Sequence, residues 1–176
     1  MLNNPLITLI RPPTLVARWA HTTPTCPPIG LAYIAGALVA AGWRTTCVDA
    51  IGSAPEQLLP TNDKRFLSHG LSGEQIVDRL NPIPSVVGIS CMFSHEWPLI
   101  RDIISLIRKR LPDATIVAGG EHISALPSFC LDDCPELDLC VVGEGENTFV
   151  EVVNALACDK PVGEVLGTVV RGNGTN

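Results

Sequence analysis

The sequence predicts an α/β domain of the doubly wound, Rossmann-like and flavodoxin-type class, in which a parallel sheet carries helices on both faces. Short apolar runs alternate with helical patterns along the chain, as expected where strands and helices alternate. These runs lack a polar face, which is typical of strands that are buried on both sides. With 176 residues, of which 46% are hydrophobic, the chain can form one domain with its own core.

Six strands are expected, each at a short run rich in β-branched and other apolar residues. In chain order they are residues 6–10, 45–49, 86–90, 115–118, 138–142 and 165–170. Longer helical patterns predict helices at residues 29–41, 74–80, 96–111 and 146–156, with a shorter one near residues 124–131. The apolar helix at residues 29–41 is expected to cover the sheet.

Two segments are longer than ordinary connections. Residues 11–28 follow the first strand and hold five prolines after Arg11, which stiffen the segment and could let it cap a ligand. Residues 51–84 are expected to form a second insertion with at most one short helix. We assign residues 1–170 to the domain, and residues 171–176, rich in Gly and Asn, to a tail or linker toward a missing catalytic domain.

Composition argues against several classes of protein. The chain has 12 Lys and Arg residues against 18 Asp and Glu, with 5% aromatic residues and no basic run, so a nucleic-acid-binding face is not expected. The apolar residues 27–42 are too few and too interrupted by glycine for a membrane span, and no secretory signal pattern opens the chain. Seven scattered cysteines fit reduced thiols, and a cytoplasmic location is expected.

A ligand site is expected where the strands end. Ligands of doubly wound sheets bind beyond the carboxyl ends of the strands, and Ser90 ends one strand while Gly119 and Gly120 end the next. Ser90 can supply one directed hydrogen bond, and the two glycines leave the backbone open to a large planar ligand. From the residues alone, Ser90 could equally cap its turn, and the glycines could be ordinary turn residues.

Four segments resemble, in order and spacing, the N-terminal cobalamin-binding domain of cobalamin-dependent (class B) radical SAM enzymes. They are residues 28–35, 87–90, 117–122 and 142–148. The wider fold, as in methionine synthase and methylmalonyl-CoA mutase, carries Asp-x-His-x-x-Gly, then Ser-x-Leu, then Gly-Gly. Here Ser90-Cys91-Met92 takes the second place and Gly119-Gly120 the third. The resemblance implies that Ser90 and the glycines border the channel for the dimethylbenzimidazole tail, which Gly120→Phe is expected to fill.

The first of these motifs departs from the pattern. Residues 49–54 align with it, but Ile51 stands where the cobalt-ligating His would be, and Ala54 where the Gly would be. Because Ile has no lone pair, the resemblance implies base-off cobalamin without a His lower ligand. A weakly ligated cobalt favours Co(I), which takes a methyl group from S-adenosylmethionine. We therefore expect a methyl carrier or a holder of redox-active cobalamin.

The resemblance also implies a set of cofactor-binding residues: Thr14, Leu15, Ile51, Ser90, Cys91, Met92, Phe93, Gly119, Gly120, His122, Gly143, Glu144 and Gly145. Cys91, Met92 and Phe93 could pack on the ligand or continue the core. His122, like His95, could reach an axial position or lie at the surface. Gly143-Glu144-Gly145 could cradle the corrin amides or form a plain turn before a helix.

Neither a catalytic residue nor a direct metal ligand is expected. Radical SAM enzymes hold an iron-sulfur cluster on C-x-x-x-C-x-x-C, and here Cys130 and Cys134 are followed only by Cys140. The cluster and S-adenosylmethionine are therefore expected on a missing or separate radical SAM domain or subunit. A zinc site using Cys130, Cys134, Cys140 and His122 is the alternative to simple thiols.

Three hypotheses about function remain open from the sequence. The favoured one is a cobalamin-binding module that serves a radical SAM methyltransferase or related enzyme. A flavin- or nucleotide-binding domain is weakened because Arg11-Pro12-Pro13-Thr14, and no G-x-G-x-x-G, follows the first strand. The third is a degenerate domain that has lost its ligand and serves only in assembly.

Overall fold

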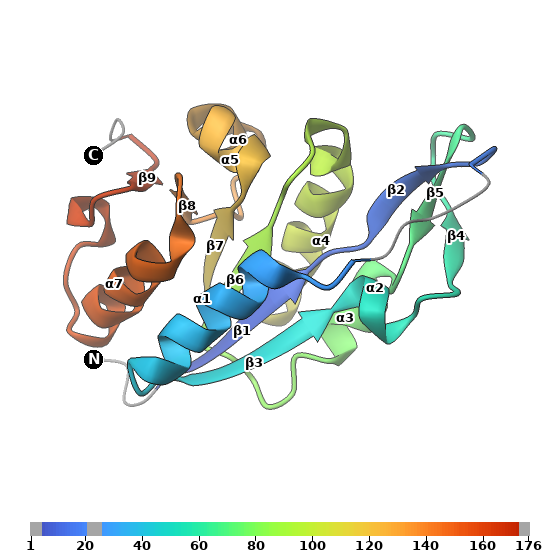
Figure 1. Cartoon of the computed structure of the whole chain (residues 1–176). Coiled ribbons are helices and arrows are strands. Elements are labelled where there is room, and N and C mark those ends of the chain that lie inside the picture. Colours follow the sequence, from blue (N-terminus) through green and yellow to red (C-terminus); the bar gives the residue numbers. More distant parts are fainter. Residues whose placement is uncertain (1–4, 21–25, 173–176) are drawn as a thin grey trace.

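The central element of the computed structural model is a six-stranded sheet with the order β3-β1-β6-β7-β8-β9 (Figure 1). Its strands are β1 Leu6–Arg11, β3 Arg44–Asp49, β6 Val86–Ser90, β7 Thr115–Gly119, β8 Leu139–Val141 and β9 Thr168–Val170. The structure describes residues 5–20 and 26–172. The first five strands are parallel, which confirms the predicted fold class.

The edge strand β9 differs from the expected wholly parallel sheet, because it pairs antiparallel with β8. After helix α7 (Gly145–Ala157), the chain passes through the 3-10 turn η2 (Val162–Glu164) and returns to the carboxyl end of β8. There the Gly167 carbonyl accepts a hydrogen bond from the Val142 amide at 2.8 Å. The chain therefore enters β9 from that end, and the strand is shorter than the predicted residues 165–170.

Helices cover both faces of the sheet (Figure 1). Helices α1 (Ile29–Ala40) and α7 pack on one face, and α3 (Gly73–Asp78), α4 (Trp97–Arg110), α5 (Glu121–Ala125) and α6 (Pro127–Asp133) pack on the other. Successive strand residues point to opposite faces. In β7, Val117 joins the α1–α7 core, whereas Ile116 and Ala118 join the core under α4. The single helix predicted near residues 124–131 is two helices, since Pro127 begins a new one.

A second, three-stranded antiparallel sheet has the order β2-β5-β4, with β2 at Thr14–Ala17, β4 at Leu58–Pro60 and β5 at Phe66–His69. The interpretation of residues 51–84 as an insertion with at most one short helix was therefore wrong. That segment holds β4, β5, α3 and most of the short helix α2 (Ala50–Ser53). Strands of three or four residues carry little periodicity, and β2 pairs with a strand about fifty residues later, so local pattern could not reveal them.

Among the residues with a described structure, no helix combines the length and the apolar character needed to cross a membrane.

The core under α4 gives a stability prediction. Ile104 is fully buried there, so Ile104→Ala is expected to lower the free energy of unfolding by about 2–5 kcal/mol through lost burial and a residual cavity. Leu166→Ala is the control, because Leu166 is 76% exposed. Urea denaturation followed by circular dichroism measures both variants. Equal midpoints for the two would contradict the placement of Ile104 in the core.

Candidate ligand pocket

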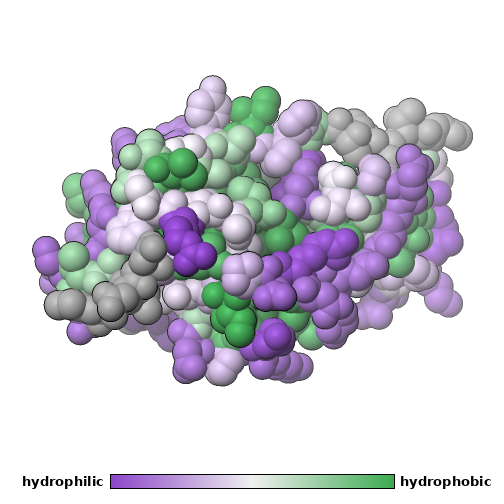
Figure 2. Space-filling view, turned by 90° about the horizontal axis from the view of Figure 1, so that it is seen from below, coloured by the Kyte–Doolittle hydropathy of each residue, from purple (hydrophilic) through white to green (hydrophobic). Residues whose placement is uncertain are grey.

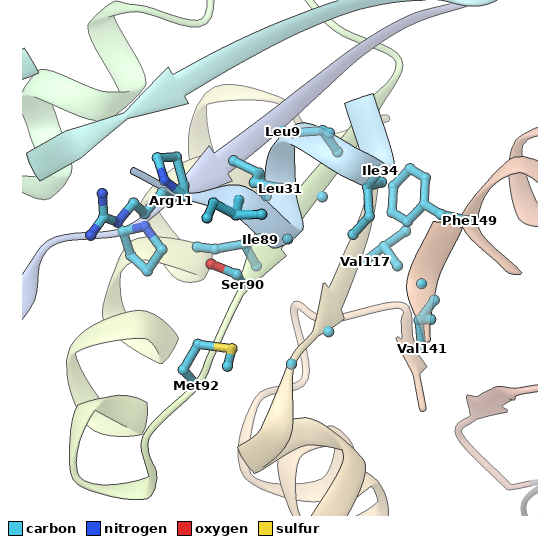
Figure 3. A pocket seen from close by; sticks show the side chains of 18 of the residues that line it. Leu9, Arg11, Leu31, Ile34, Ile89, Ser90, Met92, Val117, Val141 and Phe149 are labelled. Carbon is cyan, nitrogen blue, oxygen red and sulfur yellow. The ribbon is translucent and has the colours of Figure 1, made fainter. Parts of the chain in front are cut away.

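A cavity of about 490 Å³ opens at the carboxyl end of the sheet, between the central strands, α1 and the start of α7. Figure 3 shows Ile34, Val117 and Phe149 close together at one end of it, and Arg11, Ser90 and Met92 at the other. The first end lies between the sheet and the α1–α7 layer and is lined by apolar side chains. The second end lies where the strands finish and carries the polar groups.

Gly88 sets the depth of the apolar end. A Cβ atom at this position would lie 2.8 Å from Leu9 Cδ2 and 2.9 Å from Phe149 Cζ. Glycine in the middle of β6 therefore lets the side chains of β1 and α7 approach over the strand. A larger residue would push Leu9 and Phe149 out of their present positions on the cavity wall.

Gly119 and Gly120 both line the cavity, but for different physical reasons. Gly120 has a φ of 109°, and a Cβ atom there would lie 2.5 Å from the Cys91 carbonyl oxygen. The Cys91 amide in turn donates to the Gly119 carbonyl at 2.7 Å. Gly120 is thus required by backbone packing, as the turn alternative proposes. At Gly119 the nearest atom, the Val141 carbonyl oxygen, would lie 3.7 Å from a Cβ, so this position has room.

Most of the predicted cofactor-binding residues line this cavity, and their role in binding stays a prediction. They are Thr14, Ile51, Ser90, Met92, Phe93, Gly119, Gly120, Gly143, Glu144 and Gly145. Ser90 Oγ has no hydrogen-bond partner in the described part of the chain and remains available to a ligand. Leu15 and His95 line instead a second cavity, of about 670 Å³, between the small sheet and α4.

His122 and Cys91 lie behind the cavity wall. His122 is 4% exposed, with Nδ1 2.9 Å from Ser94 Oγ and Nε2 3.5 Å from Cys130 Sγ. Its ring packs at 5.6 Å from that of Trp97, and burial lowers its pKa. The structure therefore gives the imidazole a packing role between α4, α5 and α6. Cys91 is fully buried, and its carbonyl accepts from the His122 amide at 3.2 Å.

Four buried cysteines surround this region: Cys91, Cys130, Cys134 and Cys140. Burial raises the pKa of Cys130 and of Cys134 to about 11, and that of Cys140 to about 12. In the structure as it stands, burial therefore favours the neutral thiol form of these side chains. No three metal-ligating side chains among the described residues are grouped to hold a metal ion, so the zinc alternative has no site there.

The turn that replaces the His-bearing motif is held by Asp49. Its Oδ1 accepts hydrogen bonds from the Ile51 amide at 3.1 Å and the Gly52 amide at 3.0 Å, and so caps α2. Arg11 Nη1 lies 3.5 Å from the same carboxylate. Ile51 is 4% exposed and lines the cavity. Asp49 therefore orders a closed turn, and a buried aliphatic side chain stands where the wider fold carries the cobalt-ligating His.

The predicted set of cofactor-binding residues did not include the other residues of the cavity wall. They are Leu9, Arg11, Pro12, Cys26, Pro27, Pro28, Ile29, Gly30, Leu31, Ile34, Gly88, Ile89, Glu96, Val117, Val141, Glu146 and Phe149. Some of them belong to segments that the sequence had singled out, such as residues 11–28, whose prolines suggested a cap over a ligand. Helix α1 was expected only to cover the sheet, yet its first half lines the ligand space. No local sequence signal marked Glu96, because its partners Thr14 and Leu15 are more than eighty residues away in sequence.

Comparisons with known proteins agree with this geometry. Residues 16–153 match the family model of the B12 binding domain. The chain is 36% identical over 153 residues to cytidylyl-2-hydroxyethylphosphonate methyltransferase from Streptomyces wedmorensis, which covers 85% of this chain and 27% of the relative. It is 29% identical over 169 residues to an uncharacterized methyltransferase from Pyrococcus horikoshii, covering 96% and 33%.

A third relative is the cobalamin-dependent radical SAM methyltransferase TokK from Streptomyces tokunonensis, 31% identical over 80 residues, which are 44% of this chain and 11% of the relative. The chain thus spans about a third or less of the length of each of these three relatives. The resemblance noted in the sequence is confirmed. Since the family model covers most of the chain, this protein belongs to the B12-binding domain family, and its ligand is cobalamin.

Proposed function

We propose that this domain holds cobalamin for a radical SAM methyltransferase, as the carrier of the transferred methyl group. The observation that carries the proposal is the cavity beside β6 and β7, with an apolar inner end and Ser90 at its polar end. Bound cobalamin would supply a cobalt atom able to carry a methyl group. The names of two relatives, one a methyltransferase and one a cobalamin-dependent radical SAM methyltransferase, support this role.

The residues present fit cobalamin. The apolar end of the cavity of about 490 Å³ lies between Leu9, Ile34, Val117 and Phe149 and suits a flat aromatic base with its sugar. The corrin ring would then lie at the mouth. Met92 and Phe93 are 49% and 58% exposed there and can pack on a flat ring. In this arrangement Ser90 Oγ orients the tail, and the apolar walls exclude water from it.

The cobalt is proposed to bind without a His ligand from this chain. Ile51 offers no lone pair, and His122 is engaged with Ser94 and Cys130 behind the wall. Base-off binding would also require the benzimidazole to leave the metal for the apolar end of the cavity. The chain's own contribution at this face is then steric, because the capped turn at Asp49 fixes Ile51 in place.

A titration of the chain with hydroxocobalamin, followed by visible absorption, tests the function itself. Saturable binding with the spectrum of displaced benzimidazole is expected. After reduction to Co(II), the paramagnetic resonance spectrum should lack nitrogen hyperfine splitting from an axial base. No binding at high micromolar cobalamin would favour the degenerate assembly domain, and nitrogen splitting would contradict the His-free, base-off arrangement.

Gly119→Leu tests the placement of the tail. A leucine here is tolerated by the fold, because its Cβ would meet no atom closer than 3.7 Å, but the rest of the side chain would fill the cavity. Cobalamin affinity is expected to fall at least about tenfold, or 1.4 kcal/mol. This variant replaces Gly120→Phe, which would collide with the Cys91 backbone and disturb the fold.

Gly36→Ala is the matched control for Gly119→Leu. A Cβ at Gly36 has no atom within 4 Å, and Gly36 does not line the cavity. Unchanged affinity in Gly119→Leu, with a circular dichroism spectrum like that of the original chain, would remove the proposed tail position.

We further propose that the radical SAM part of the enzyme covers the mouth of the cavity and the outer face of α1. The relatives are about three times as long as this chain or longer, so in them further polypeptide is present to make this contact. Helix α1 has the sequence IGLAYIAGALVA, without a charged residue, and Ile29, Tyr33 and Val39 are 62%, 64% and 60% exposed. A helix that is apolar all round is normally buried.

The surface view supports this choice of face. Figure 2 shows green and nearly white residues gathered over the part of the surface where α1 lies, whereas purple residues dominate the end that holds the small sheet. The exposed side chains Met92, Phe93 and Ile29, the last at the start of α1, all line the same cavity. One partner surface can therefore cover the corrin and the helix together.

Gly36→Arg tests this contact. The new side chain meets nothing in the domain, and replacing a helical glycine should stabilise α1 slightly. Its charge would lie on the apolar face, so association with the radical SAM part is expected to weaken at least about tenfold, while cobalamin affinity stays unchanged. Leu166→Arg, at a side chain 76% exposed elsewhere, is the control. Equal association of both variants, measured by gel filtration or calorimetry, would place the contact elsewhere.

A further inference from the structure

Glu96 is a buried carboxylate on the wall of the cofactor cavity. It ends the 3-10 turn η1 (Ser94–Glu96), which leads from β6 into α4, and it is only 5% exposed. Within the described ranges it is the only Asp or Glu among the buried polar and charged residues. Buried carboxylates are normally paired with a cation or saturated by hydrogen bonds.

The contacts of Glu96 leave half of the carboxylate unused. Oε1 accepts from Thr14 Oγ1 and from the Leu15 amide, the latter at 3.3 Å, and so attaches β2 to the turn that leads into α4. No hydrogen bond to Oε2 and no Lys or Arg paired with Glu96 is found in residues 5–20 and 26–172. Oε2 is not one of the enclosed atoms without a partner, and Glu96 lines the cavity. Because a carboxylate can accept about four hydrogen bonds, this group can accept further bonds from a ligand.

The other charged residues of the cavity wall indicate which kind of ligand group could donate a hydrogen bond to Glu96. Arg11 is a cation on the wall, and it faces Asp49 at 3.5 Å. Glu144 and Glu146 add two further carboxylates. A ligand group that meets Glu96 should therefore donate hydrogen bonds and carry no negative charge. A primary amide meets both conditions, and a carboxylate meets neither.

We propose that Glu96 Oε2 accepts a hydrogen bond from one of the primary amides on the rim of the corrin ring. Glu96 then distinguishes the complete cofactor from forms in which that amide is a carboxylate. This inference rests on the proposed function, because it assumes that cobalamin occupies the cavity. Oε2 of Glu96 would then determine specificity, whereas Oε1 has the structural role of holding Thr14 and Leu15.

The test uses cobalamin and its three isomeric monocarboxylates, in each of which one propionamide is hydrolysed. Affinities are measured by absorption titration at pH 7.5 for the original chain and for Glu96→Gln. The original chain is expected to bind at least one monocarboxylate about tenfold or more weaker than cobalamin, because two carboxylates would face each other. Glu96→Gln should reduce that ratio severalfold. Glutamine keeps an oxygen for Thr14 and Leu15, so β2 stays attached.

Glu151→Gln is the control, because Glu151 is exposed on α7 and outside the cavity, and it should keep the ratio of the original chain. Identical ratios in the original chain and Glu96→Gln for all three isomers would overturn the proposal. Absence of binding to intact cobalamin would instead overturn the proposed function, so the two failures are distinguishable. A loss of binding in Glu96→Gln for every form equally would assign Glu96 a purely structural role.

Discussion

The close approach of two backbone segments at the ends of β6 and β7 is the constraint on which the site depends. The Cys91 amide donates to the Gly119 carbonyl, and the Cys91 carbonyl lies where a side chain at Gly120 would have to be. This contact holds the segment after β6 against the segment after β7. It thereby fixes the positions of Ser90, Met92 and Glu96 relative to the open backbone at Gly119. This backbone contact therefore determines where the lining residues at the ends of β6 and β7 lie.

Hydrogen bonds of the Asp49 turn explain how the structure accommodates the change in the first motif of the family pattern. A carboxylate at the end of β3 is kept, but its partners are two amides of its own turn and Arg11. The turn remains ordered without the histidine, since side-chain capping by Asp49 does not need one. The ordered turn is therefore kept in this chain, although the histidine that ligates cobalt in the wider fold is replaced by Ile51.

The sequence could predict the elements whose signal is local. The apolar runs of β1, β6 and β7 and the periodicity of α4 and α7 place these elements within about two residues. The small sheet could not be predicted, because short strands such as Thr14–Ala17 form only against a distant partner. For the site, the rule that ligands bind after the strands pointed to Ser90 and Gly119. It could not point to Ile34 and Phe149, which reach the cavity from helices. Glu96 was likewise hidden, since its environment exists only after β2 has packed beside it.

Helix α1 has a consequence for the energetics of assembly. Its inner side, through Leu31 and Ile34, belongs to the cofactor cavity, while its outer side carries the exposed Tyr33 and Val39. An element shared by two binding sites couples their equilibria whenever binding on one side changes its position or mobility on the other. Thermodynamic reciprocity then requires that any gain in cofactor affinity on docking be matched by an equal gain in docking affinity on cofactor loading. The helix would therefore make the loaded domain the preferred one for assembly.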